Sequence, residues 1–202
     1  MNQYRQEGKR RRSIRLQDYD YSQNGAYFIT ICTHNRECFF GDIVADEMLL
    51  NEAGRMIESA WNDIPRRFPG VSLDASIVMP NHLHGIIVIE DAVGANLLCA
   101  QERCGRLQGG RIQDSPLQAG TLAGTVGRMV QAFKSITTND YIVGVKQHGW
   151  PSFPGKIWHR DYYEHIIRSE KVLNATREYI VYNALRWALD PENPTRGREN
   201  TE

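Results

Sequence analysis

The chain has 202 residues, 41% of them hydrophobic, and its 24 Lys and Arg residues balance 24 Asp and Glu residues. This length suits one domain with a sizeable core. No apolar run approaches the roughly 20 residues that cross a bilayer, and the polar, basic N-terminus has no apolar signal segment. We therefore expect a cytoplasmic protein without a membrane partner, whose four cysteines stay reduced.

Basic residues concentrate in an N-terminal arm (1–15), although the net charge of the chain is zero. The candidate phosphate contacts in this arm are Arg10, Arg11, Arg12 and Arg15. Such an arm can pair with the phosphates of a nucleic acid. It can equally be a solvated, flexible tail, and the residues leave both readings open.

The first half of the chain predicts strands and one helix. The expected elements are a strand at 27–33, a weaker strand at 43–50, a helix at 51–67 and strands at 73–78 and 83–89. The first strand alternates and is rich in aromatic and β-branched residues. Asn51 is a suitable residue to cap the start of the helix, because its side chain can accept a hydrogen bond from a free backbone N–H.

The second half predicts two helices around one strand. The expected elements are a long insertion (90–120), a helix at 122–141, a strand at 157–167, a helix from Ser169 or Glu170 onward and a polar tail (191–202). An insertion of this length in a compact domain usually indicates function or disorder. The order of elements predicts a single α+β domain over residues 1–202, in which helices cover an antiparallel sheet.

Two histidines, His82 and His84, flank Leu83 inside a run of strand-forming residues. Side chains alternate along a strand, so the histidines share one face while Leu83 points into the opposite layer. Two neutral imidazoles on one face form half of a divalent-metal site. The alternative is a pair of surface or hydrogen-bonded histidines without a ligand.

A tyrosine and an asparagine lie four residues apart in the predicted last helix, where Leu173, Ile180, Ala184 and Trp187 would form the buried stripe. At this spacing Tyr179 and Asn183 share a helix face. Asn183 could give an oxygen to a hard cation near the group that Tyr179 attacks. The alternative is that Tyr179 is an interface aromatic with a hydrogen-bonded hydroxyl.

Three blocks in this order resemble the REP-associated tyrosine transposases, which belong to the HUH (His-hydrophobe-His) single-tyrosine transposases. The blocks are Met79 to Gly85, Trp158 to Arg168 and Glu178 to Trp187. The resemblance extends from about Arg12 to Pro194. The chain departs from the family pattern at Ala184, where the family usually has Pro, and at His159, where it usually has Gln.

The resemblance implies a ferredoxin-like antiparallel sheet with helices packed on it and a C-terminal helix that carries the catalytic tyrosine. It implies that His82, His84 and Asn183 hold Mg²⁺ or Mn²⁺ while Tyr179 attacks single-stranded DNA, forming a 5′-phosphotyrosine. The implied partner is DNA with a REP-like hairpin. The implied state is a monomer rather than a dimer, with the tyrosine acting in cis.

Further residues take roles by the same resemblance. Lys134 and Arg160 are candidate DNA contacts, and His165 is a candidate supporting residue beside the site. Three other functions remain open: a domesticated hairpin-binding protein that cuts nothing, a nicking initiator of the same superfamily, and a His-dependent nucleotide hydrolase that needs no tyrosine.

Overall fold

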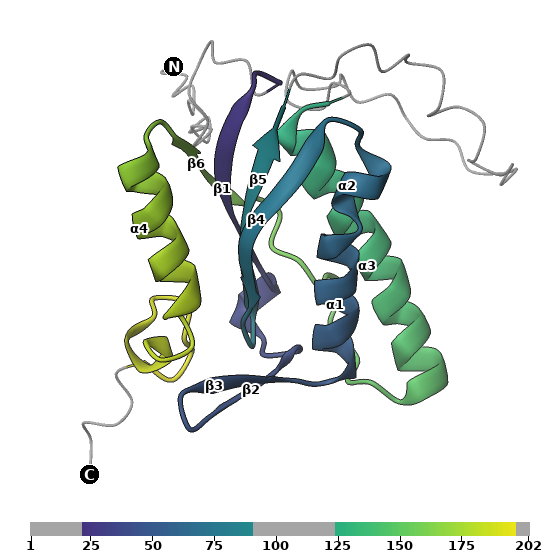
Figure 1. The fold of residues 1–202 in the computed structure, drawn as a ribbon. Coiled ribbons are helices and arrows are strands. Elements are labelled where there is room, and N and C mark those ends of the chain that lie inside the picture. The colour runs from purple at the N-terminus through teal and green to yellow at the C-terminus, as the bar shows by residue number, and fades with distance from the viewer. Residues whose placement is uncertain (1–21, 91–123, 197–202) are drawn as a thin grey trace, which may run out of the picture.

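The computed structural model describes residues 22–90 and 124–196, which form a sheet covered by helices on both faces (Figure 1). Three predicted features fall wholly or mostly outside these ranges. The first is the basic arm (1–15) with its four candidate arginines. The second is the predicted insertion (90–120), of which only Glu90 is described. The third is the polar tail, which is described only as far as residue 196.

Four strands form the central sheet: β1 (Gly25–Cys32), β4 (Val71–Val78), β5 (His82–Ile89) and β6 (Tyr163–Ile167). Their order across the sheet is β4-β5-β1-β6, and each neighbouring pair is antiparallel. Helix α1 (Glu52–Asn62) lies between β1 and β4 in the chain, and α3 (Val126–His148) lies between β5 and β6. This topology is ferredoxin-like, which confirms the predicted fold class.

The two sheet faces carry different helices. Helices α1 and α3 cover one face, and α4 (Glu170–Val181) covers the other (Figure 1). Along β5, Leu83 and Ile87 join the core under α1 and α3, whereas Ile86 joins a smaller core with Ile180 of α4. The even-numbered residues of β5, including both histidines, therefore point toward α4, as the alternation predicted.

Gly85 allows α1 to approach the sheet closely. A Cβ atom at this position would overlap the indole ring of Trp61, which packs across β5 from α1. We expect Gly85→Ala to lower the free energy of unfolding by about 2 kcal/mol, because an overpacked core must shift its neighbours. Urea unfolding measures the loss, and Ser76→Ala, at an exposed position opposite Gly85 on β4, is the matched control. Equal stabilities of the two variants would contradict this packing.

The weak strand predicted at 43–50 is wrong as a single strand. The segment belongs to a β-hairpin, in which β2 (Gly41–Val44) pairs with β3 (Glu47–Leu50) across a two-residue turn. Ala45 and Asp46 between them have φ angles of 49° and 63°, the left-handed conformation of a two-residue hairpin turn. The Asn-Gly pair that usually announces such a turn is absent, so the sequence pattern did not reveal it.

The helix predicted at 51–67 begins where expected, because the Asn51 side chain accepts a hydrogen bond from Gly54 N at 2.9 Å. It ends earlier than predicted, at Asn62, and a separate turn of helix, α2 (Ile64–Arg67), follows. Pro65 sits at the start of α2 and has no N–H to continue the hydrogen-bond pattern of α1.

The other predicted boundaries also moved. Helix α3 continues to His148, beyond the predicted end at residue 141, and Gly149 ends it in the left-handed conformation. The strand predicted at 157–167 is regular only in β6, and its first part touches the sheet through a single bridge from Trp158 to Thr33. Within the described ranges, no helix has both the length and the apolar character needed to cross a membrane.

Candidate metal and nucleophile site

His82 and His84 lie buried on the α4 face of β5, with ring centroids 4.5 Å apart. Each ring uses Nδ1 in a hydrogen bond. His84 Nδ1 is 2.8 Å from the Thr30 hydroxyl on β1, and His82 Nδ1 is 2.9 Å from Asn81 Oδ1. Metal-binding histidines commonly use one ring nitrogen in this way, which fixes the ring and directs the other nitrogen to the metal.

Asn81 determines the tautomer of His82. Its Nδ2 donates to the backbone oxygens of Arg36 at 3.0 Å and Glu192 at 2.7 Å, so its Oδ1 must face His82. Because a carbonyl oxygen only accepts, His82 donates from Nδ1 and keeps a lone pair on Nε2. Nε2 of His82 is buried and has no hydrogen-bond partner. Nothing in the sequence pattern had indicated this role of Asn81.

Tyr179 projects from α4 onto the histidine pair. Its hydroxyl oxygen is 3.3 Å from His84 Nε2, and its ring packs edge-on against Phe28 and His84. Tyr179 is 37% exposed, so it is only partly covered by the protein. A second tyrosine, Tyr182, lies three residues further along the chain at the end of α4. It is 48% exposed, with the Arg186 guanidinium 6.0 Å from its ring centre.

Asn183 reaches the site, but not from the helix on which it was predicted. Helix α4 ends at Val181, and Asn183 lies in the turns that follow, with its N–H donating to Ile180 O. The side chain is buried, and its Oδ1 has no hydrogen-bond partner. The structure therefore brings together the four predicted residues His82, His84, Tyr179 and Asn183.

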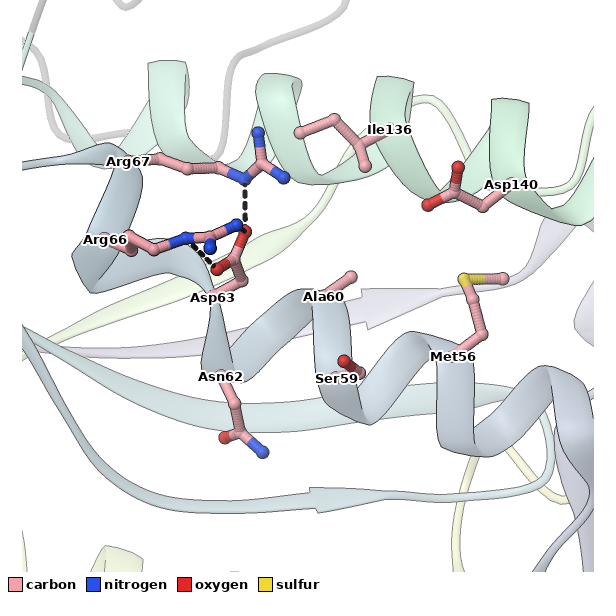
Figure 2. Close-up of a pocket in the computed structure, with 9 residues that line it drawn as sticks. All are labelled: Met56, Ser59, Ala60, Asn62, Asp63, Arg66, Arg67, Ile136 and Asp140. Atoms are coloured by element: carbon pink, nitrogen blue, oxygen red, sulfur yellow. Dashed lines mark hydrogen bonds and ion pairs between the residues drawn. The ribbon is translucent and has the colours of Figure 1, made fainter.

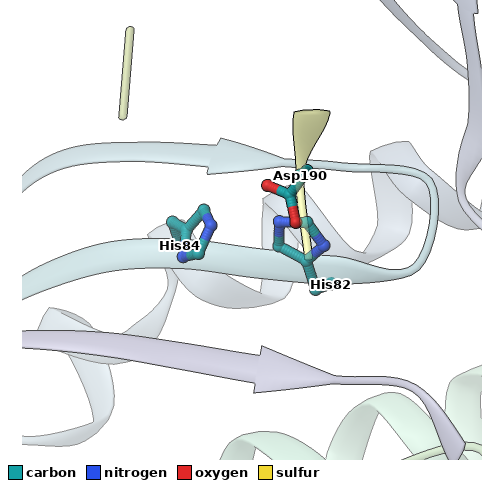
Figure 3. A group of neighbouring side chains, drawn as sticks. All are labelled: His82, His84 and Asp190. Carbon is teal, nitrogen blue, oxygen red and sulfur yellow. The ribbon is translucent and has the colours of Figure 1, made fainter. Parts of the chain in front are cut away.

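Asp190 is a member of the site that sequence reasoning missed. One ligand atom from each of His82, His84 and Asp190 lies within 4.8 Å of the others, and the carboxylate sits beside the two imidazole rings (Figure 3). The predicted helix gave no reason to bring residue 190 back toward the sheet. Only the chain reversal after Val181 places it there.

The Arg177 guanidinium ties α4 to the sheet. Its Nε and terminal nitrogen donate to the two carboxylate oxygens of Asp74 on β4, at 2.8 and 2.6 Å. These hydrogen bonds lower the pKa of Asp74. A two-point Arg–carboxylate contact restricts direction as well as distance, so it helps to hold the helix that carries Tyr179.

Burial keeps the site histidines neutral. It lowers the pKa of His82, although the negative charges of Asp190 and Glu192 partly oppose this effect. Burial also lowers the pKa of His84 well below the usual range, and the neighbouring His82 adds to the shift. For Tyr179, burial raises the pKa, as does the charge of Asp190, while the Asn183 side chain lowers it. In the metal-free protein Tyr179 is therefore a neutral phenol beside neutral imidazoles.

These shifts predict acid sensitivity of the metal-free fold. Below the ordinary histidine pKa of about 6.5, His82 and His84 bind protons in the unfolded chain but stay neutral in the folded chain. The free energy of unfolding therefore falls as the pH falls. Between pH 7.5 and 5.5 we therefore expect the free energy of unfolding to fall, by at most about 3 kcal/mol, in urea titrations with chelator. A His82→Gln, His84→Gln double variant should lose much less, and an equal loss would contradict the assignment.

The donor set fits a small divalent cation. Two neutral imidazoles and an amide oxygen converge with a buried carboxylate, and two of these groups carry buried atoms without a partner, His82 Nε2 and Asn183 Oδ1. Mixed nitrogen and oxygen ligands of this kind suit a divalent cation. A His-His-Asp cluster that could bind a metal is therefore present.

Lys134 has a structural role in this conformation. Its Nζ donates to the backbone oxygens of His159, Arg160 and Asp161 at 2.9, 3.4 and 3.1 Å. Burial lowers the pKa of Lys134 to about 8. The ammonium group thus holds the segment before β6 against α3.

Two further candidates lie outside this cluster. Arg160 is exposed, with its side chain available to a partner. His165 is exposed on the edge strand β6, opposite Phe28 in the register. Neither belongs to the group formed by the histidine pair, Tyr179 and Asn183.

A separate pocket of about 530 Å³ lies between α1, α2 and α3, on the other side of the sheet (Figure 2). Its two arginines, Arg66 and Arg67, both pair with Asp63. Their charges are therefore already balanced within the protein. The two histidines whose pKa values are lowered by burial, His82 and His84, lie instead on the opposite face, under α4.

Comparison with known proteins identifies similar proteins by sequence and by structure. An uncharacterized protein of Haemophilus influenzae is 41% identical over 184 residues, which cover 89% of this chain and 91% of the relative. No family model matches the chain. The solved structure of a REP-associated tyrosine transposase bound to a REP hairpin aligns with a TM-score of 0.51 and 18% identity, covering 92% of this chain and 74% of that one. The structural likeness shows a shared fold.

Proposed function

We propose that this chain, which belongs to the same family as the Haemophilus influenzae protein and has the fold of a REP-associated tyrosine transposase, cleaves and rejoins single-stranded DNA. The observation that carries the proposal is the position of the Tyr179 hydroxyl, 3.3 Å from His84 Nε2 and on the same face as His82. A nucleophile beside a cation site is the arrangement that this reaction needs.

Three side chains would hold the cation: His82 and His84 through Nε2, and Asn183 through Oδ1. Mg²⁺ or Mn²⁺ bound there would polarise the scissile phosphate and stabilise the charge that develops on it. Thr30 and Asn81 fix the two imidazole rings from behind. The protein thus prepares the ligand geometry before any substrate arrives.

In the proposed reaction the Tyr179 oxygen attacks the phosphorus atom. A bond forms from that oxygen to phosphorus, the bond from phosphorus to the 3′-oxygen breaks, and the leaving 3′-oxygen takes up a proton. The phenol loses its own proton. Because burial and Asp190 raise the pKa of Tyr179, this loss requires a base or added positive charge near the oxygen. Attack by another 3′-hydroxyl on the 5′-phosphotyrosine joins strands.

We propose hairpin-bearing DNA of the REP type as the substrate, since the structurally similar transposase is bound to a REP hairpin. The basic arm, with Arg10, Arg11, Arg12 and Arg15, and the exposed Arg160 would contact phosphates. Lys134 would contribute only if it released the backbone oxygens that it now holds. His165 would support the site from the edge of the sheet.

Residues 1–202 would form a single domain of this type. The protein would act in the cytoplasm, where its DNA substrate is located. Tyr179 reaches the histidine pair of its own chain, which supports a monomer with the tyrosine acting in cis.

Incubation with a labelled hairpin oligonucleotide that carries a single-stranded flank tests the proposal. With Mg²⁺ or Mn²⁺ we expect cleavage in the flank, a free 3′-hydroxyl and a protein–DNA adduct that survives denaturation. Binding of the hairpin without cleavage would favour a non-catalytic hairpin-binding protein. Cleavage without an adduct would favour a hydrolase. Equal adduct formation with oligonucleotides that have and lack the hairpin would favour a nicking initiator.

A further inference from the structure

Asp190 is a buried carboxylate whose charge is not balanced by an ion pair within the described ranges. It is 6% exposed, and the ion pairs formed by Arg36, Arg66, Arg67 and Arg177 all go to other acids. One oxygen, Oδ1, accepts from Glu192 N at 2.7 Å. A buried carboxylate without a neighbouring cation is destabilising, so its presence at this place points to a positive partner.

Within the described ranges, the two site histidines lie next to Asp190, at a place where such a partner could bind. Asp190 offers an oxygen within 4.8 Å of a ligand nitrogen of each histidine, a separation that one small cation can bridge (Figure 3). Nε2 of His82, one of these two histidines, is buried and has no hydrogen-bond partner. An unpartnered nitrogen and an unbalanced carboxylate therefore face the same small volume.

Asp190 also decides which end of the Asn183 amide faces the histidines. Asn183 Nδ2 donates toward Asp190 Oδ2 at 3.5 Å, and Asn183 Oδ1 is left without a partner. The opposite orientation would place the amide oxygen against the carboxylate, with two acceptors in contact. The carboxylate thus keeps the Asn183 oxygen available to a cation.

The position of Asp190 is fixed by contacts to the strand that carries the histidines. The Asp190 N–H donates to Trp187 O at 3.0 Å, and the Trp187 ring lies 5.9 Å from the His82 ring. Asn81, which orients His82, also donates to Glu192 O. The segment from Trp187 to Glu192 is therefore attached to the histidine strand independently of Asp190's charge.

We propose that Asp190 is a ligand of the cation that His82 and His84 hold, and that it orients Asn183 toward the same cation. This inference rests on the proposed function, because it adds a fourth protein group to the cation site proposed there. The site then contains one negative charge among neutral ligands. A divalent ion bound in it would tie the segment after α4, and with it the helix that carries Tyr179, to β5.

Calorimetric titration of the metal-stripped full chain with Mn²⁺ tests this assignment. We expect Asp190→Asn to weaken Mn²⁺ binding by about tenfold or more, since Asn keeps the size and the Glu192 contact but removes the charge. Glu192→Gln is the matched control. It removes an equal charge two residues away, from a side chain that pairs with Arg36, and should change affinity by less than about threefold.

Thermal unfolding separates ligation from a purely structural role. Without metal, Asp190→Asn should be at least as stable as the wild type, because a buried uncompensated charge is gone. With Mn²⁺ the wild type should gain stability and the variant should gain much less. A variant that is less stable without metal and keeps the full Mn²⁺-induced rise would overturn the proposal.

Two outcomes distinguish this inference from the proposed function. If the wild type binds no Mn²⁺, the cation site itself is wrong and both fail. If the wild type and Asp190→Asn bind Mn²⁺ equally, only the role of Asp190 fails. Should the variant not fold, anomalous scattering from a Mn²⁺-soaked crystal of the wild type decides: the ion should lie about 2.1 Å from an Asp190 oxygen, and an ion beyond direct contact overturns the proposal.

Discussion

His82→Ala and His84→Ala are each expected to abolish cleavage of the hairpin oligonucleotide in Mg²⁺ or Mn²⁺. A bound cation that stabilises a developing charge contributes several kcal/mol, which corresponds to more than about a hundredfold in rate. Hairpin affinity should change little, because both rings are buried under α4 and offer no surface to a duplex stem. Cleavage of a labelled oligonucleotide and a gel-shift titration measure the two quantities separately.

His148→Ala is the control for this experiment. His148 is exposed at the end of α3, which packs on the opposite face of the sheet, so its loss should leave the cleavage rate unchanged. Wild-type cleavage by either site variant would remove the basis for the cation site. Loss of hairpin binding in both would show instead that the histidines act through the fold.

Tyr179→Phe should eliminate the covalent protein–DNA adduct while the protein stays folded. The substitution removes one oxygen and leaves the ring, whose edge-on contacts with Phe28 and His84 need no hydroxyl. The half-exposed hydroxyl contributes little to stability, so thermal unfolding should shift only slightly. Denaturing gels of the protein after incubation with labelled DNA measure the adduct.

Tyr182→Phe provides the matched control, three residues along the chain. Tyr182 is 48% exposed at the end of α4, with the Arg186 guanidinium over its ring, and the adduct should form at the wild-type level. An adduct that persists in Tyr179→Phe and disappears in Tyr182→Phe would reverse the assignment of the nucleophile.

The features that sequence predicted best depend on local periodicity. Alternation along residues 82–89 placed Leu83 and the histidines in opposite layers, because a strand side chain's direction follows from its position in the strand. The Asn51 cap is equally local, since its partner is three residues away. The antiparallel sheet covered by helices followed from the order of these elements together with the family resemblance.

The remainder of the site depends on chain reversals that local patterns do not encode. Ala184 gave no stop signal, so a continuous helix was predicted through Asn183, whereas α4 ends at Val181. The turns that follow are fixed by distant contacts, such as the one from Asn81 to Glu192 O. Asp190 becomes part of the site only through those contacts, and no spacing within the sequence indicates it.

The role of Lys134 shows the same limit. A charged residue off the buried face of a helix predicts solvent or a phosphate, but Lys134 instead satisfies three backbone oxygens from the segment before β6. These acceptors lie 25 or more residues away in sequence. Only the packing of α3 beside that segment brings them together.

Peptide mapping of the trapped adduct tests the central claim most directly. The wild-type protein is incubated with a hairpin-bearing oligonucleotide and Mg²⁺ or Mn²⁺, digested, and analysed by mass spectrometry for the nucleotide-linked peptide. The geometry predicts a single modified residue, Tyr179, whose oxygen lies 3.3 Å from His84 Nε2. A nucleotide on Tyr182 or on any other residue would contradict this account.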